Sequence, residues 1–368
     1  MRPSRDGSRG VRACTGDGHD QAQTSFITLF GRRRCAILVT ALLLALTHAA
    51  AADDVENFYR GRTLTVVISY SVGGGYDLYA RVLARYLGKY IPGHPTIVPE
   101  NMPGAGGLRA SNYLYTAAAK DGSVIGTFSR SIPTMPLVDP TLSFDGRKFT
   151  WLGSMSSDTS LCLTRSTSSV KTWQDMLTMP VVMGGQYAAA DSDIYARLYN
   201  NVLGTKIKLV SGYPGTNDIT LAMERGEVEG ICGLSWGTIK IAHPEWVTGK
   251  SVNFLLQAAL KKEPELADVP LTLDVIDDPV KKQILSLHFA PQAIGRPFAA
   301  PPNIPDDRKA ALIRAFDDTM KDPEFLEETA KAKMDIAPMT GQEIDVLLTQ
   351  LYALPPDVVA KAAKAIIE

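Results

Sequence analysis

The sequence predicts an α/β fold of two domains with mostly parallel sheets. Apolar, β-branched runs alternate with amphipathic stretches along most of the chain. This alternation is typical of parallel sheets that are covered by helices. The 316 residues that follow residue 52 are enough for two domains of ordinary size.

The expected elements follow from these runs. We expect strands at Thr63–Ser69, Thr96–Pro99, Val124–Phe128, Leu161–Thr164, Val181–Met183, Lys206–Val210, Gly230–Leu234 and Phe254–Ala258. We expect helices at Asp77–Tyr90, Gly106–Ala119, Thr172–Leu177, Ser192–Leu203, Thr216–Arg225 and Asp306–Lys321. Prolines between 297 and 305 interrupt the pattern and mark a connection before the last of these helices.

A glycine loop is the most informative segment. An apolar run, Leu64–Ile68, leads into Gly73, Gly74 and Gly75, and Asp77 then opens an amphipathic stretch. Glycines let backbone N–H groups approach a ligand, and a helix N-terminus favours an anion. The segment is therefore either an anion-binding loop or only a tight turn. It matches neither a Walker A motif nor a dinucleotide fingerprint.

The first 52 residues have the features of a secretory signal peptide. Three arginines at 32–34 precede the apolar run Cys35–Leu46, and alanines at 49–52 follow it. The run is shorter than the roughly 20 residues that span a bilayer. No lipobox cysteine lies at the expected cut after Ala51 or Ala52. We therefore expect an exported, periplasmic protein.

The charge balance argues against a binder of nucleic acid or of anionic membranes. Residues 1–52 hold seven Arg and three Asp, so the remainder carries 31 basic and 36 acidic residues, a formal charge of −5. A mildly acidic chain has no general attraction to polyanions.

Two cysteines remain after the signal segment. Cys162 and Cys232 lie in strand-like segments and either pair in an oxidising compartment or stay as buried thiols. We favour thiols slightly, because the sequence does not show the geometry that a disulfide needs. Neither cysteine has metal-ligand spacing, and we expect no metal and no cofactor.

Several motifs occur in order along the chain. They are F-Y-x-G-R-T at 58–63, S-V-G-G-G-Y-D at 71–77 with Ala80 and Arg81, V-P-E-N-M-P-G-A-G-G at 98–107, A-A-K-D-G-S-V-I-G at 118–126, G-Y-P-G-T at 212–216 and D-V-P at 268–270. Together they resemble the extracytoplasmic solute receptors of the tripartite tricarboxylate transporter family, also called Bug-type receptors. The resemblance covers essentially the whole chain after residue 52.

The resemblance implies a two-domain clamshell, like other periplasmic binding proteins, with an interdomain cleft and a hinge. The first domain would comprise residues 53–163 plus 292–368, and the second residues 164–291. The implied function is capture of a small organic carboxylate and its delivery to membrane permease subunits. We expect a monomer, no nucleic-acid partner and no enzymatic activity.

The resemblance also implies the site residues. From the first domain they are the loop residues Ser71, Gly73, Gly74, Gly75, Tyr76 and Asp77, and then Ser129, Arg130 and Ser131 after the third expected strand. From the second domain they are Gly185, Asp191, Ser192, Gly215, Thr216 and Asn217, and we add Trp236 after the strand Gly230–Leu234.

The sequence departs from the family pattern at some of these positions. The family usually has proline at position 71, and small or hydroxyl residues at 75, 76 and 130, whereas this chain has Ser71, Gly75, Tyr76 and Arg130. The segment Gly185–Ser192 is less rich in serine and glycine than expected. These departures leave the fold inference intact but leave the ligand open.

Four residues have alternative interpretations. Arg130 either clamps a carboxylate with its planar guanidinium or is a solvent-facing loop residue. Tyr76 either walls the cleft or covers the next helix turn. Asp77 fits a helix N-cap better than a ligand contact, because a carboxylate repels an anion. Trp236 either floors the pocket or, as is more common for tryptophan, packs in the core.

Catalysis has little support. After residue 52 the chain has only His94, His243 and His288, isolated in sequence, and lacks the G-x-S-x-G and H-E-x-x-H motifs. Two alternatives to a transport receptor remain, namely an exported α/β hydrolase-like enzyme and an orphan sensing receptor without a transport role.

Overall fold

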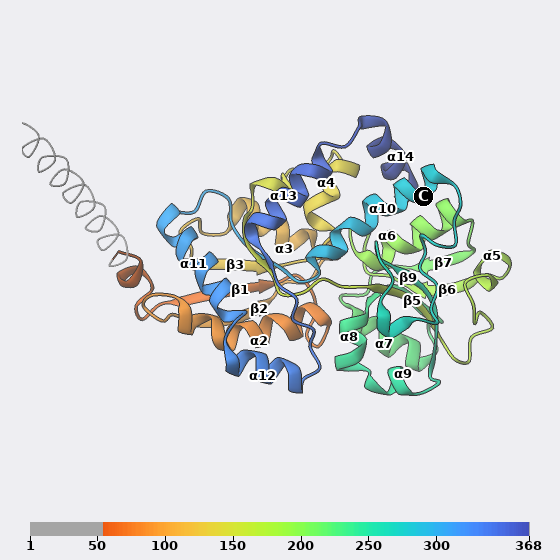
Figure 1. Cartoon of the computed structure of the whole chain (residues 1–368), viewed down its shortest axis with the longest axis horizontal. Helices are drawn as coiled ribbons and strands as arrows, with labels where there is room; N and C mark the ends of the chain where they lie inside the picture. The colour runs from red at the N-terminus through yellow and green to blue at the C-terminus, as the bar shows by residue number, and fades with distance from the viewer. Residues whose placement is uncertain (1–53, 368) are drawn as a thin grey trace, which may run out of the picture. The chain divides into compact units, whose positions relative to one another are not determined.

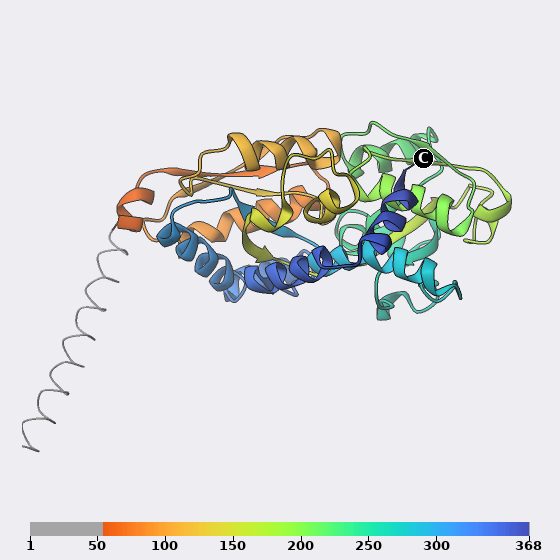
Figure 2. The ribbon, with the colours of Figure 1, turned by 90° about the horizontal axis from the view of Figure 1, so that it is seen from above.

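The computed structural model describes residues 54–367. The predicted signal peptide lies outside these residues. The described chain forms two β-sheets, each with its own helices, and the two sheets occupy opposite halves of the ribbon in both views (Figure 1, Figure 2).

The first sheet has six strands in the order β11-β4-β10-β3-β1-β2. Their bounds are β1 Thr63–Ile68, β2 Thr96–Asn101, β3 Val124–Thr127, β4 Thr150–Ser154, β10 Pro297–Ala300 and β11 Met339–Thr340. β1 pairs in parallel with β2 and β3, whereas β10 pairs antiparallel with β3 and β4, and β11 pairs antiparallel with β4.

The second sheet has five strands in the order β7-β6-β8-β5-β9. Their bounds are β5 Ser160–Arg165, β6 Val181–Gly184, β7 Ile207–Val210, β8 Gly230–Ser235 and β9 Val252–Ala258. β6 pairs in parallel with β7 and β8, and β5 pairs antiparallel with β8 and β9.

Both sheets are therefore mixed, and the expectation of mostly parallel sheets is wrong: three of the five strand pairings in the first sheet and two of the four in the second are antiparallel. The reason lies in how the chain passes between the sheets. β4 ends at Ser154 and the chain enters the second sheet at β5, while β10 brings the chain back to the first sheet. A strand that leaves and a strand that returns run in opposite directions, so β4 and β10 are antiparallel neighbours.

Helices cover both sheets. Their bounds are α2 Gly75–Tyr90, α3 Leu108–Asn112, α4 Met135–Val138, α5 Asp175–Thr178, α6 Asp191–Leu198, α7 Thr216–Arg225, α8 Trp236–Ala242, α9 Pro244–Thr248, α10 Pro279–Phe289, α11 Asp306–Thr319, α12 Pro323–Lys331, α13 Gly341–Tyr352 and α14 Pro356–Ile366. α2 packs on β1 and β2 and also contacts α11 and α12. The final helix, α14, contacts α4, α6 and α10.

The apolar pattern of α2 explains why it forms and where it packs. Val82, Leu83 and Leu87 recur at helical spacing and are buried. Burying each such side chain contributes about 1.5–3 kcal/mol. This anchors the helix on the sheet and fixes its N-terminus, Gly75, beside the end of β1.

All eight expected strands are confirmed, with ends that differ by at most two residues. The expected helix Thr216–Arg225 is confirmed with its bounds, and the helix after Asp77 begins two residues earlier, at Gly75. The expected helix Gly106–Ala119 is interrupted, because Gly106 and Gly107 adopt positive φ angles of 63° and 100°. α3 therefore starts only at Leu108.

The slight preference for free thiols is wrong. Cys162 on β5 and Cys232 on β8 form a disulfide, because the antiparallel pairing of these strands places the two cysteines side by side. None of the helices in the described part of the chain is both long and apolar enough to cross a membrane.

Candidate functional site

A small cavity lies where loops from both sheets meet. It encloses about 30 Å³. Its lining comes from the ends of β1, β3, β6 and β8 and from the starts of α2, α6 and α7. The lining residues are Tyr70, Gly74, Gly75, Tyr76, Ser129, Arg130, Gln186, Asp191, Thr216, Gly233, Leu234, Ser235, Thr238 and Arg296. Ligands of α/β folds bind at such strand ends.

The glycine loop allows the two halves to approach closely. A Cβ on Gly75 would lie 2.1 Å from Thr238 Oγ1, and a Cβ on Gly215 would lie 2.2 Å from Ser71 Oγ. Both distances are shorter than atoms tolerate, so a side chain at either glycine would force the hydroxyl of Thr238 or of Ser71 to move. Ser71 itself donates to Asp218 Oδ2 at 2.7 Å, which links the glycine loop to α7.

Asp77 shapes this loop from within α2. Its carboxylate accepts hydrogen bonds from Gly73 N at 3.0 Å, Arg81 Nε at 2.9 Å and Asn101 Nδ2 at 2.8 Å. Burial would raise the pKa of Asp77, but these donors outweigh it and lower the pKa. The expectation of an N-cap is wrong in position: Gly74 is the N-cap, and Asp77 reaches back from the first turn.

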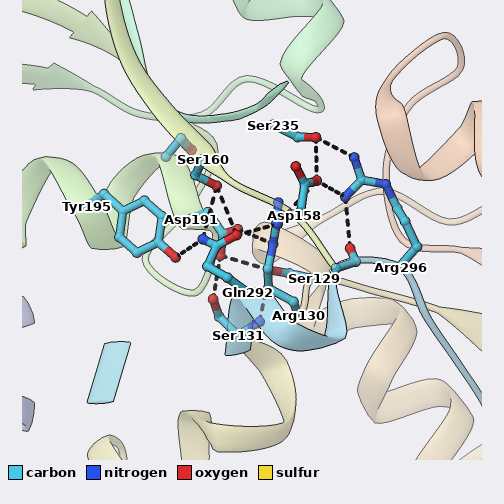
Figure 3. Close-up of polar contacts among 12 residues, drawn as sticks. Ser129, Arg130, Ser131, Asp158, Ser160, Asp191, Tyr195, Ser235, Gln292 and Arg296 are labelled. Carbon is cyan, nitrogen blue, oxygen red and sulfur yellow. Dashed lines mark hydrogen bonds and ion pairs between the residues drawn. The ribbon is translucent and has the colours of Figure 1, made fainter. Parts of the chain in front are cut away.

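Arg130 is buried, with 2% of the residue exposed. Its Nε lies 2.8 Å from Asp191 Oδ2, and its Nη1 lies 3.3 Å from Asp158 Oδ2 and donates to Gln292 Oε1 (Figure 3). The interpretation of Arg130 as a solvent-facing loop residue is therefore excluded. Its guanidinium bridges the two halves of the molecule, because Asp191 begins α6 beside the second sheet.

The carboxylate of Asp191 lies where the sequence analysis expected a ligand carboxylate. It faces Arg130 Nε and accepts from Ser129 Oγ at 3.2 Å and from Ser131 Oγ (Figure 3). Ser129, Arg130 and Ser131 are the three residues that we expected to bind an acid. In this structure the protein supplies that acid itself.

Arg296 is a second buried arginine, and the sequence analysis missed it. Its Nη1 lies 2.8 Å from Asp158 Oδ2, and its Nη2 donates to Ser235 Oγ at 2.6 Å and to Thr238 Oγ1 at 3.1 Å. Its guanidinium also lies over the rings of Tyr76 and Tyr79, at 5.1 and 4.8 Å. The sequence feature that could have indicated this residue is a charged side chain inside the otherwise apolar run I-G-R-P-F-A-A.

Asp158 connects the two arginines. It lies between β4 and β5, where the chain passes from the first sheet to the second. Burial would raise its pKa, but Arg296 and Arg130 outweigh this effect and lower the pKa. The aspartate therefore stays charged and holds both guanidinium groups in place.

Seven of the expected site residues line the cavity, namely Gly74, Gly75, Tyr76, Ser129, Arg130, Asp191 and Thr216. Tyr76 thus forms part of the wall, and its hydroxyl accepts from the backbone N–H of Arg130 at 3.0 Å. The expected residues that contact this lining are Ser131, which binds Asp191, and Ser192, whose hydroxyl accepts from Gln186 N at 3.1 Å.

Other residues that we expected in the site lie behind the cavity lining. Gly73 faces the side chain of Asn217, and Gly185 lies against Asp193. Trp236 lies away from the cavity lining. It packs in the core against Phe254 and donates from Nε1 to Glu265 Oε2 at 2.7 Å, so the core interpretation of this residue is correct.

Gln186 is a further residue that the sequence analysis did not single out. It lines the cavity with 4% of the residue exposed, and its Nε2 finds no acceptor among residues 54–367. Buried donors are normally paired. An unpaired amide in a cavity wall is suited to bind an oxygen atom of a ligand.

Within residues 54–367, no group of three or more His, Cys, Asp or Glu side chains is arranged to hold a metal ion. The polar groups of the cavity are hydroxyls, amides, two guanidinium groups and one carboxylate. Such a set can bind and orient a small polar molecule.

The chain was compared with known proteins, and no family model matches it. It is 26% identical over 312 residues to the "UPF0065 protein in the TAR-I ttuE-ttuC' intergenic region" of Agrobacterium vitis, which covers 83% of each chain. The structure of the periplasmic binding protein BugD matches with a TM-score of 0.68 and 19% identity, over 84% of this chain and 99% of BugD. MatC from Rhodopseudomonas palustris with bound malate matches with a TM-score of 0.62 and 22% identity, over 83% of this chain and 99% of MatC.

These matches show that the chain has the two-domain fold of periplasmic binding proteins. The resemblance to Bug-type solute receptors that the motifs indicated is confirmed.

Proposed function

We propose that this chain is a periplasmic receptor that captures a small organic carboxylate between its domains and delivers it to membrane permease subunits. The observation that carries this proposal is the cavity, where Arg130, Ser129 and Ser131 of one domain already hold a carboxylate, that of Asp191, from the other. The two serine hydroxyls donate charge-assisted hydrogen bonds to this carboxylate, and Arg130 Nε forms an ion pair with it at 2.8 Å.

Ligand entry requires the domains to separate. The cavity is small, about 30 Å³, and Asp191 already takes the hydrogen-bond donors that a ligand acid would need. We propose that the segments next to Asp158 and Arg296, where the chain passes between the sheets, act as the hinge, and that the domains comprise residues 53–163 plus 292–368 and residues 164–291.

The structural relatives support the class of ligand. MatC carries malate, a carboxylic acid, and it has the same fold as this chain. The alternative of an exported hydrolase-like enzyme has less support. Ser129 and Ser235 line the cavity, but no histidine or lysine is among the lining residues to activate them.

A thermal-shift screen of carboxylic acids on the mature chain tests the proposal, together with mass spectrometry of whatever co-purifies. A ligand that binds only the folded state raises the unfolding free energy by about 2.7 kcal/mol at 100 times its Kd. We expect at least one acid to do so without being consumed. Turnover of the compound would favour the enzyme. A neutral or cationic compound as the tightest ligand would contradict the carboxylate assignment.

A further inference from the structure

We propose that Asp191 is an internal competitor of the ligand: it holds the two domains together when no ligand is bound, and an acid has to displace it to bind. This inference rests on the proposed function and adds to it a control of the same site by a side chain of the protein itself. It makes Asp191 a residue that sets the affinity of the site, although the ligand does not need its charge.

Asp191 makes the contacts that are expected for a bound acid. Its Oδ1 accepts hydrogen bonds from Ser129 Oγ at 3.2 Å and from Ser131 Oγ, and its Oδ2 lies 2.8 Å from Arg130 Nε (Figure 3). All three groups belong to the loop that follows β3 in the first domain, whereas Asp191 begins α6 in the second. Asp191 is 7% exposed. It therefore acts on this loop as a carboxylate that is tethered to the opposite domain.

The ion pair removes the electrostatic obstacle to closing an empty site. A cation that is buried without a partner is strongly unfavourable, so a cleft that contains one should close only around an anion. In this cavity each charged side chain of the lining has a partner: Arg130 lies 2.8 Å from Asp191, and Arg296 lies 2.8 Å from Asp158. The charges of the closed site are thus neutralised by the protein alone.

The shapes of the two walls also allow closure without a ligand. Ser71 Oγ donates directly to Asp218 Oδ2 at 2.7 Å across the two domains. Next to Asp191, a Cβ on Gly106 would lie 2.8 Å from Ala190 N, so a side chain at this glycine would push the walls apart. The walls are therefore in direct contact on both sides of a cavity of about 30 Å³.

A second aspartate in the same helical turn shows that the position of Asp191 is more than a helix signal. A carboxylate in the first turn favours the helix N-terminus, and both Asp191 and Asp193 lie in the first turn of α6. The carboxylate of Asp193 stays within the second domain, where it accepts from Gln186 N at 2.6 Å. Asp191 instead reaches the first domain, and stabilising α6 does not require this contact.

An internal competitor lowers the apparent affinity for an acid. Only the fraction of molecules whose site is open can take up a ligand, and the apparent Kd rises as this fraction falls. A ligand-free population that is closed by roughly ten to one would weaken binding about tenfold. Asp191→Asn removes the charge and keeps the size of the side chain. It should therefore open the ligand-free chain and strengthen the binding of an acid.

The first test measures the separation of the domains without any ligand. Spin labels on Leu221→Cys in α7 and Leu326→Cys in α12, at positions that are 42% and 39% exposed, report this distance by pulsed electron paramagnetic resonance. We expect a single short distance in the labelled chain that L-malate and adipate leave unchanged. Adding Asp191→Asn should lengthen the ligand-free distance. Adding Asp277→Asn, an equal change at an exposed position of the second domain, should not.

The second test measures affinity. Calorimetry with L-malate, adipate, succinate and citrate compares the wild type with Asp191→Asn, and we expect at least one acid to bind the variant about tenfold or more tightly. If Asp191→Asn does not fold, Ser131→Ala replaces it in the distance measurement. That variant removes one donor to Asp191 and keeps every charge, so it should lengthen the ligand-free distance in the same direction.

Two results would overturn the inference and leave the receptor function intact. One is a ligand-free distance that is the same with and without the charge of Asp191. The other is an acid that binds the wild type as tightly as Asp191→Asn or more tightly. If no carboxylic acid binds either chain, the proposed function fails, and the ligand-free distances still decide whether Asp191 holds the domains together.

Discussion

Two buried parts of the molecule hold titratable side chains in opposite ways. In the cavity, Arg130, Arg296, Asp158 and Asp191 are buried as ion pairs. Between α10 and α14, His288 is buried, and it forms no ion pair with any residue of the described range 54–367. Burial lowers its pKa to about 4, and its Nε2 lies 3.0 Å from the carbonyl oxygen of Ala362.

This difference between paired charges and a neutral side chain distinguishes a binding site from a purely structural contact. Charges that are held ready in pairs can change partners, so the cavity can exchange Asp191 for a ligand. A histidine that is buried as the neutral form has no charge to exchange, and it serves only the packing of α14. Substitutions and pH should therefore affect the two regions differently.

The largest effect is expected for Arg130→Ala. It leaves Asp191 without its cation and Asp158 with only Arg296. Removing one partner of a buried ion pair costs about 3–5 kcal/mol. Urea unfolding should show this loss, and calorimetry should show ligand affinity reduced about tenfold or more.

Arg85→Ala is the matched control. Arg85 pairs with Glu328 at the surface, and exposed pairs add little. This variant should keep both stability and affinity. Equal effects of the two substitutions would remove the distinction between the cavity and the surface.

The next effect is a loss of stability in mild acid that arises from His288. Its pKa is 6.5 when unperturbed and about 4 in the folded chain. The unfolded state therefore takes up a proton first as the pH falls. The contribution of neutral His288 to the free energy of unfolding is fully present above pH 6.5. Roughly 3 kcal/mol of this free energy is lost as the pH falls to 4.

Urea unfolding at several pH values measures this loss. His288→Gln should flatten the dependence between pH 6.5 and 4. The depressed pKa of Asp158 places its own contribution in a lower window, since that stability is lost only as the pH falls below the ordinary value of 3.8. A slope in His288→Gln equal to that of the wild type would show that another group is responsible.

The smallest effect is expected for Ser71→Ala. Ser71 Oγ donates to Asp218 Oδ2 at 2.7 Å between the glycine loop and α7, and under the domain closure that we propose this bond forms only in the closed state. A bond to a charged group contributes about 1.5–3 kcal/mol when buried. This one is partly exposed, so we expect affinity to fall only about threefold. Calorimetry with unchanged affinity would show that this contact does not hold the domains together.

Many of the strands and helices can be predicted from local sequence patterns. The strands that the sequence analysis missed are those that depend on pairing with a strand far away in the sequence. β-branched runs identify β1 and β8 because each is apolar over its length. β4 and β10 escaped detection because both are short. β4 contains Gly153, β10 begins at Pro297, and the two pair with each other although the whole second sheet lies between them in sequence.

The residues of the candidate site also divide into those that local sequence predicts and those that it does not. The glycine loop and Ser129–Ser131 follow directly from strands, so the rule that ligands bind at strand ends locates them. Arg296 and Asp158 lie on the segments between the sheets, which have no periodicity. The pairing of Arg130 with Asp191 joins segments that belong to different sheets, and no local pattern encodes it.

A crystal structure of the mature chain with its acid bound tests the central claim most directly. The account predicts that a ligand carboxylate lies within hydrogen-bond distance of the Arg130 guanidinium, with the present 2.8 Å contact between Arg130 Nε and Asp191 Oδ2 broken. A bound acid elsewhere, with that ion pair intact, would contradict it.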